Sequence, residues 1–318
     1  MASDLADKLD HQDFVVLDGG VATELERRGC DLRHRLWSAA ILAERPDAIR
    51  DVHLAYLRAG ADCITTVAYQ ASVPGFLAAG YSRAAANDLY RASVRLAFEA
   101  QLDWCRDRGL RPDDRAAPVV AMSIGSYGAF LADGSEYRGR YPVTDDELRT
   151  FHRERLALAV EELRQWTDRP LIAFETVPSL AEAVLLAELL AEHRDAAAWI
   201  SFSCDGVRLT AEGQPVAECA RRLEGCDQVL ALGVNCTSSR DVTELVTAMA
   251  TGAKPVLAYP NAGGDYDATR KRWVGDGEEA NERLFGEWLR SGARGLGGCC
   301  RTTPEWIARL VAFRDGRR

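Results

Sequence analysis

The chain has 318 residues, of which 47% are hydrophobic and 27% charged, so it can form a large packed core, and disorder is excluded. Its formal net charge of −9 is opposite in sign to the basic surface that a general nucleic-acid or membrane-surface binder needs. The charged N-terminus has no signal-peptide core, and no run approaches the roughly 18 apolar residues of a membrane helix. We therefore expect a soluble cytoplasmic protein without nucleic-acid or membrane partners.

Short apolar runs alternate with longer amphipathic stretches along the chain. The apolar runs predict eight strands, at residues 14–17, 61–68, 118–124, 170–175, 198–203, 229–234, 254–259 and 293–297. Helices are expected near 44–59 and 82–106, after the capping box that Thr144 forms with Glu147, after Ser179, and from Pro304 onward. The Gly- and Tyr-rich segment 127–141 is expected to be a long loop.

The strands read as continuous apolar runs, which is typical of parallel strands covered by helices on both faces. Eight such β/α units without a linker predict a closed (β/α)8 TIM barrel, with residues 1–318 forming one domain. An open, doubly wound sheet is the alternative.

Polar and reactive residues follow several of the predicted strands. In a barrel, active sites gather at the carboxyl ends of the strands. These ends carry Asp18, Glu175, Cys236, Asn261 and the adjacent pair Cys299 and Cys300. Two carboxylates and three cysteines would therefore converge on one face.

We predict that Cys236, Cys299 and Cys300 bind Zn²⁺. Thiolates are soft ligands, and three of them leave one position of tetrahedral zinc open for an exogenous ligand. Adjacent strand residues point to opposite faces, so the chain must leave regular strand geometry at Cys299 and Cys300. Gly297 and Gly298 are expected to permit this through their backbone freedom.

Other interpretations of the same residues remain open. The cysteine pair could be small apolar residues of a buried strand, or a strained vicinal disulfide. Asp18 could form a turn, and Glu175 could cap the following helix. The protein could also be a non-enzymatic zinc or redox protein. The other six cysteines are interpreted as packing or surface residues, and the five histidines form no metal-binding pattern.

The motifs of the chain resemble those of the homocysteine S-methyltransferases, and most closely the short, cobalamin-independent members that use S-methylmethionine or S-adenosylmethionine. The resemblance covers nearly the whole chain and lies in residues 17–25, 36–39, 69–72, 128–139, 174–179, 233–236, 259–261 and 297–304.

The resemblance implies a zinc-dependent methyltransferase that moves a methyl group from a sulfonium donor to the thiol of L-homocysteine, giving methionine. It implies Cys236, Cys299 and Cys300 as zinc ligands. The residues that match the homocysteine-binding positions are Asp18, Gly19 and Glu175, with the carboxylates near the ammonium group, and Asn261 matches a fourth zinc contact of the substrate-free site.

The resemblance leaves some properties open. The acceptor could be selenocysteine or another small thiol. Ser126 and the run Gly263-Gly264-Asp265 depart from the pattern of close relatives on loops expected near the donor, so they bear on donor choice. Betaine-using relatives carry extra C-terminal dimerisation segments and this chain ends at Arg318, so we expect a monomer or a weak homodimer.

Overall fold

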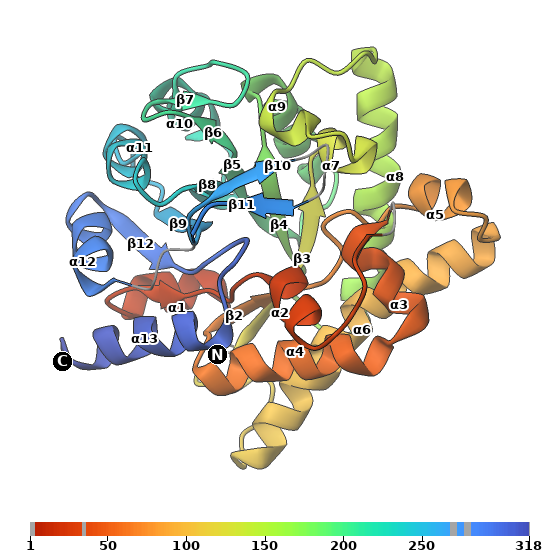
Figure 1. Ribbon diagram of the computed structural model, residues 1–318, viewed down its shortest axis with the longest axis horizontal. Coiled ribbons are helices and arrows are strands. Elements are labelled where there is room, and N and C mark those ends of the chain that lie inside the picture. The colour runs from red at the N-terminus through yellow and green to blue at the C-terminus, as the bar shows by residue number, and fades with distance from the viewer. Residues whose placement is uncertain (1–3, 34–35, 268–271, 277–280, 318) are drawn as a thin grey trace.

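The computed structural model describes residues 4–33, 36–267, 272–276 and 281–317 (Figure 1). Within them, eight parallel strands form one sheet in the order β1-β12-β9-β8-β5-β4-β3-β2. These strands are β1 (Val15–Val16), β2 (Cys63–Thr65), β3 (Val119–Gly125), β4 (Leu171–Val177), β5 (Ala197–Phe202), β8 (Val229–Ser238), β9 (Val256–Asn261) and β12 (Ala293–Leu296).

The two edge strands of this order, β1 and β2, also meet. Leu17 forms an isolated parallel bridge with Cys63. The backbone N–H of Asp62 donates to the carbonyl of Val16 at 2.7 Å, and the N–H of Val16 donates to Asp62 Oδ2 at 2.8 Å. The sheet is therefore a nearly closed barrel, and the alternative of an open, doubly wound sheet is wrong.

Helices surround the strands on the outside of the barrel (Figure 1). They are α1 (Leu5–His11), α2 (Val21–Arg27), α3 (Ile41–Glu44), α4 (Pro46–Ala59), α5 (Val73–Ala78), α6 (Arg83–Asp107), α7 (Tyr127–Leu131), α8 (Asp145–Leu163), α9 (Leu180–Leu190), α10 (Val216–Leu223), α11 (Val242–Met249), α12 (Glu282–Arg290) and α13 (Pro304–Asp315), with 3-10 turns η1 (Trp37–Ala40) and η2 (Ser135–Tyr137). In the part of the chain that is described, none of them is long and apolar enough to span a bilayer.

The core has two layers. A large cluster of buried residues fills the space between strands and helices. A smaller cluster fills the barrel itself, with side chains such as Leu171, Trp199 and Leu257 from the strands. Leu5 and Leu9 of α1 belong to this inner cluster, at 1% and 4% exposure, so α1 closes the amino end of the barrel. The carboxyl end is left for the loops that follow the strands.

All eight predicted strands are confirmed, with shifts of a few residues at their ends. The capping box is confirmed as well, because Thr144 Oγ1 accepts from the N–H of Glu147 and Glu147 Oε2 accepts from the N–H of Thr144. The segment 127–141 connects β3 to α8, as the prediction of a long loop requires, but it also contains the short elements α7 and η2, which were not predicted. Two small antiparallel pairs were also not predicted: β6 (Cys204–Asp205) with β7 (Leu209–Thr210), and β10 (Asp265–Asp267) with β11 (Arg272–Val274).

Candidate active site

A cavity of about 1150 Å³, open to solvent, lies at the carboxyl ends of the barrel strands. Six of the residues singled out from the sequence line it: Asp18, Gly19, Glu175, Cys236, Cys299 and Cys300. Asn261 does not line the cavity, although it is buried nearby at the end of β9.

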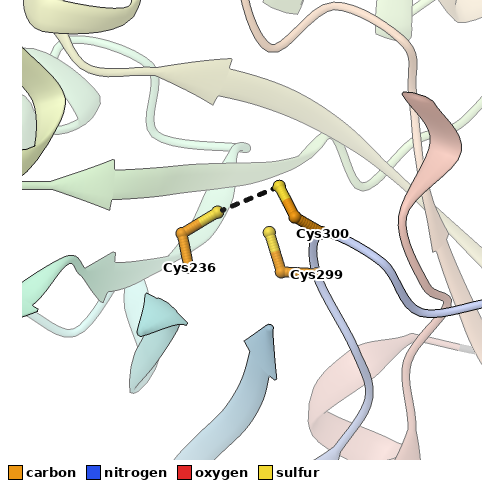
Figure 2. Close-up of side chains that lie close together, drawn as sticks. All are labelled: Cys236, Cys299 and Cys300. Atoms are coloured by element: carbon orange, nitrogen blue, oxygen red, sulfur yellow. Dashed lines mark hydrogen bonds between the residues drawn. The ribbon is translucent and has the colours of Figure 1, made fainter. Parts of the chain in front are cut away.

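The three cysteines come together at this cavity. Their Sγ atoms all lie within 4.8 Å of one another, and the Sγ atoms of Cys236 and Cys300 are 3.9 Å apart (Figure 2). Cys236 comes from β8, whereas Cys299 and Cys300 come from the turn after β12 (Figure 2). Elements that lie 64 residues apart in the sequence thus supply one cluster.

The geometry of this cluster suits a tetrahedral metal ion. Two sulfurs bound to one zinc at roughly 2.3 Å lie about 3.8 Å apart, close to the observed separation of Cys236 and Cys300. Hydrogen bonds from the thiols of Cys299 and Cys300 lower the pKa of Cys236 well below its usual value. The hydrogen bond to Cys236 raises the pKa of Cys299 and of Cys300 in turn. A bound cation would favour the deprotonated form of all three thiols.

All nine cysteines are free thiols, so the alternative of a Cys299–Cys300 disulfide is absent from this structure. Within the described residues, the other six cysteines belong to no group that could hold a metal ion; four of them are buried, and Cys204 and Cys226 are half-buried.

The backbone bends sharply where it presents Cys236. Cys236 has a φ of +49° and Thr176, on neighbouring β4, has a φ of +56°, which is a strained conformation for residues with a Cβ. The strand registers shift at both places. Asn235 joins the two bends, because its Oδ1 accepts from the N–H of Thr176 at 2.8 Å and its Nδ2 donates to Thr176 Oγ1 at 2.9 Å.

The turn that carries Cys299 and Cys300 is held by backbone contacts. The N–H of Cys299 donates to the carbonyl of Pro260 at 2.8 Å, and the N–H of Cys300 donates to Asn261 Oδ1 at 3.1 Å. The carbonyl of Cys300 accepts from the N–H of Ala262 at 3.0 Å. The side chain of Asn261 therefore orients Cys300 by accepting from its backbone N–H. A direct contact of Asn261 with a metal stays a prediction.

Gly297 and Gly298 were expected to be needed for their backbone freedom, and this reason is wrong. Neither glycine has a positive φ. A Cβ on Gly297 would lie 2.7 Å from Leu17 Cβ, and a Cβ on Gly298 would lie 2.4 Å from Thr302 Oγ1. These positions require glycine because neighbouring chain segments pack directly against the backbone, which brings the cysteine turn close to β1.

Asp18 and Glu175 are buried in the cavity wall, with exposures of 4% and 8%. Asp18 Oδ2 accepts from the N–H of Thr65 at 2.8 Å, and the hydroxyl of Ser123 donates to Glu175 Oε2. Burial raises the pKa of Asp18 well above its usual range and that of Glu175 to about 7. A bound cation would stabilise the ionised form of both carboxyl groups. The helix-cap alternative for Glu175 is not needed, because the side chain of Ser179 caps α9. The carboxylate of Asp18 is bonded to Thr65 of β2, a separate segment of the chain.

Several residues of the cavity were not predicted as site residues. Glu136, on η2, lines the cavity with Tyr69 and Tyr137. Thr176 also lines the cavity, and its backbone has a positive φ, as that of Cys236 does. The only sequence signal for Glu136 and Tyr137 is their place in the 128–139 motif. Ser126, which departs from the family pattern, is fully buried and does not line the cavity.

Comparisons with known proteins agree with this geometry. A family model described as homocysteine S-methyltransferase matches residues 15–313. The homocysteine S-methyltransferase YbgG of Bacillus subtilis is 43% identical over 96% of this chain and 96% of its own. A selenocysteine Se-methyltransferase of Brassica oleracea is 45% identical over 95% of this chain and 90% of its own. The metallated form of the homocysteine methyltransferase MmuM from Escherichia coli superimposes with a TM-score of 0.84 at 39% identity, covering 96% of this chain and 98% of that one.

Proposed function

Because the chain belongs to the homocysteine S-methyltransferase family, we propose that it moves a methyl group from a sulfonium donor to the thiol of L-homocysteine, giving methionine. Cys236, Cys299 and Cys300 would hold a zinc ion for this reaction. The observation that carries the proposal is the cluster of three thiols within 4.8 Å of one another in a cavity that also presents Asp18 and Glu175.

The acceptor thiol must lose its proton before it can attack. A free thiol with a pKa of about 8.5 is only about 3% ionised at pH 7, so complete ionisation gains roughly 30-fold in nucleophile, or about 2 kcal/mol. A zinc ion held by Cys236, Cys299 and Cys300 would supply this by acting as a Lewis acid that lowers the pKa of the acceptor thiol. The cysteines contribute three negative charges, which keep the sulfur electron-rich.

Asp18 and Glu175 would bind the ammonium group of homocysteine. Both carboxylates are buried and partly hydrogen-bonded, so a bound ammonium group would offset the cost of ionising them there. Their position beside the cysteines would hold the acceptor sulfur close to the cluster. The strained bends at Cys236 and Thr176, tied together by Asn235, would fix that position before the substrate arrives.

The transfer itself is a displacement at the methyl carbon. The acceptor sulfur forms a bond to this carbon, and the bond to the donor sulfonium breaks, leaving its electron pair on a neutral thioether. The leaving thioether takes up no proton, so the cavity needs no general acid. The chief contribution of the protein is to bring the reacting atoms within about 3–3.5 Å and in line.

The cavity lining also favours this class of donor. Among the described residues, the lining includes Asp18, Glu136 and Glu175 but no Lys, Arg or His. Such a cavity attracts a cationic sulfonium compound and disfavours anionic ligands. S-methylmethionine and S-adenosylmethionine both have the required charge, and S-methylmethionine is the smaller of the two.

Selenocysteine is a second candidate acceptor, because one relative with 45% identity is a selenocysteine Se-methyltransferase. A selenol would use the same cysteine cluster and the same ammonium site. Competition between homocysteine and selenocysteine for one donor would measure the preference directly. Family membership argues against the non-enzymatic alternative of a zinc or redox protein.

A methyl-transfer assay tests the proposal. Homocysteine is supplied with S-methylmethionine, S-adenosylmethionine or betaine, with and without a chelator. We expect methionine from a sulfonium donor, none from betaine, and loss of activity with chelator that added zinc restores. Absence of methyl transfer from both sulfonium donors, or full activity after removal of zinc, would refute the proposal.

A further inference from the structure

Glu136 has a buried carboxylate oxygen without a partner. The residue is 8% exposed and lines the cavity that contains the three cysteines. Its Oε2 has no hydrogen-bond partner among the described residues. Burying a carboxylate oxygen without a partner is costly, so such an atom at a cavity wall indicates a ligand that carries donors or positive charge.

The segment that presents Glu136 is firmly packed. The hydroxyl of Ser203, after β5, donates to the carbonyl of Glu136 at 2.6 Å. Gly128 packs so closely on this turn that a Cβ there would lie 2.3 Å from the nitrogen of Glu136. The N–H of Ser135 is held by Asp133 Oδ1 at 2.9 Å. The carboxylate is thus built into the cavity wall.

The three carboxylates of the cavity differ in their surroundings. Asp18 accepts from Thr65, and Glu175 accepts from Ser123. These partners belong to β2 and β3, whereas Glu136 is tied to the segment after β5. The neighbouring Arg138 is directed to Asp133, with Nη2 3.3 Å from the carbonyl of Asp133. Glu136 is therefore a separate acidic position, and in the described part of the chain no Lys, Arg or His side chain is hydrogen-bonded to its carboxylate.

A transfer between two amino acids brings two ammonium groups into one cavity. The function proposed above assigns Asp18 and Glu175 to the acceptor, which leaves Glu136 as the carboxylate of the cavity without an assigned partner. We infer that Glu136 binds the α-ammonium group of the methyl donor, a sulfonium amino acid; this rests on the function proposed above. Tyr69, Tyr137 and Trp37 line the same cavity. The rings of Trp37 and Tyr69 pack edge to face, with their centroids 6.4 Å apart.

The ammonium group is a better partner for Glu136 than the sulfonium. The sulfonium loses its charge as the methyl group leaves, so a carboxylate against it would stabilise the substrate more than the transition state. The charge of the ammonium group persists through the reaction. A contact with it lowers the KM for the donor and leaves kcat nearly unchanged.

Steady-state kinetics and calorimetry of Glu136→Gln test this inference. We expect the KM for S-methylmethionine, and its Kd without acceptor, to rise about tenfold or more, whereas kcat and the KM for homocysteine stay within about twofold. Glu136→Asp, which keeps the charge, should lie between the wild-type protein and Glu136→Gln. Asp146→Asn is the control, because it removes one exposed carboxylate outside the cavity lining, and should leave the Kd within about twofold.

An ammonium-free sulfonium, (2-carboxyethyl)dimethylsulfonium, makes the test specific. Its Kd should be equal for the wild-type protein and Glu136→Gln. An unchanged Kd for S-methylmethionine in Glu136→Gln, equal weakening of both sulfonium compounds, or a raised KM for homocysteine alone would overturn the inference. Failure of the proposed function would look different, because the wild-type protein itself would then transfer no methyl group, while the calorimetric comparison would still decide the role of Glu136.

Discussion

Cys236 lies at a backbone bend that the local sequence does not predict. A φ of +49° at Cys236 and of +56° at Thr176 is costly for residues with a Cβ, and the reciprocal hydrogen bonds of Asn235 hold both bends. Groups that orient a metal ligand contribute to affinity without touching the metal. We therefore assign Asn235 to the support of the proposed zinc site.

Replacement of Asn235 should weaken metal binding. Asn235→Ala removes both hydrogen bonds to Thr176, so we expect zinc affinity to fall by about 10- to 100-fold. Competition with a chromophoric chelator measures this affinity. Ser238→Ala, at the exposed end of the same strand, is the control and should bind zinc like the wild-type protein. Equal affinity in Asn235→Ala would show that Asn235 does not support the site.

Glu175 should make ligand binding depend on pH. Burial raises its pKa to about 7, so its ionised fraction falls as the pH drops below 7. Only the ionised form attracts the ammonium group of the ligand. Methionine carries this group but no thiol, so its Kd should weaken roughly tenfold from about pH 8 to about pH 6. Calorimetry measures this change. Glu175→Gln should show a weaker pH dependence than the wild-type protein, with the remainder set by Asp18, whose pKa burial also raises. An unchanged dependence in that variant would contradict the assignment.

The site residues differ in how well the sequence could predict them. Asp18, Glu175 and the three cysteines follow apolar runs, so the rule that barrel sites lie at strand ends selects them. Glu136 lies on the η2 turn, far from any strand end in sequence, so no such rule selects it. The bend at Thr176 depends on Asn235 of a different strand, and local patterns carry no information about such a contact.

At the level of elements, the turn after β12 decides where two of the three sulfurs lie. The sequence correctly marked Gly297 and Gly298 as special. The sequence alone does not show whether glycine is required there for its backbone conformation or for its small size. The atoms that approach these glycines belong to Leu17 and Thr302, which lie elsewhere in the chain.

Gly298→Ala should damage both stability and the metal site. Its Cβ would lie 2.4 Å from Thr302 Oγ1, a contact that forces the turn or Thr302 to move. We expect a loss of about 1–3 kcal/mol in the free energy of unfolding, together with weaker zinc binding. Urea denaturation and chelator competition measure the two effects.

Gly225→Ala is the matched control for that substitution. No atom lies within 4 Å of a Cβ at Gly225, and its φ is not positive, so this variant should be close to wild type in both measurements. If Gly298→Ala were as stable and as well metallated as Gly225→Ala, close packing would not be the reason for glycine at position 298.

For the whole molecule, the alternation of strands and helices predicted the order of elements and a closed barrel, but not the contacts that close the sheet. Closure depends on the seam between β1 and β2, which lie about 46 residues apart and share one isolated bridge. Asp62 seals this seam, because its backbone and carboxylate bind Val16. Its carboxylate also pairs with Arg314 of α13, which is 8% exposed.

Asp62→Ala should therefore destabilise the barrel strongly. The variant leaves the guanidinium of Arg314 buried without its partner, and we expect a loss of about 3–5 kcal/mol in the free energy of unfolding. Urea denaturation measures it. Asp195→Ala breaks the exposed ion pair with Arg164 and should cost at most about 1 kcal/mol. Equal effects of the two substitutions would contradict a sealing role for Asp62.

The proposed reaction depends above all on a zinc ion held by Cys236, Cys299 and Cys300. The most direct measurement is the zinc content of the purified protein and of each Cys→Ser variant, together with methyl transfer to homocysteine. We expect about one zinc per chain in the wild-type protein, and in each of the three variants loss of zinc and of about 100-fold or more in activity. Cys226→Ser, a half-buried cysteine outside the cluster, should keep both. Full activity in a zinc-free protein, or in a variant of the cluster that binds no zinc, would contradict the account.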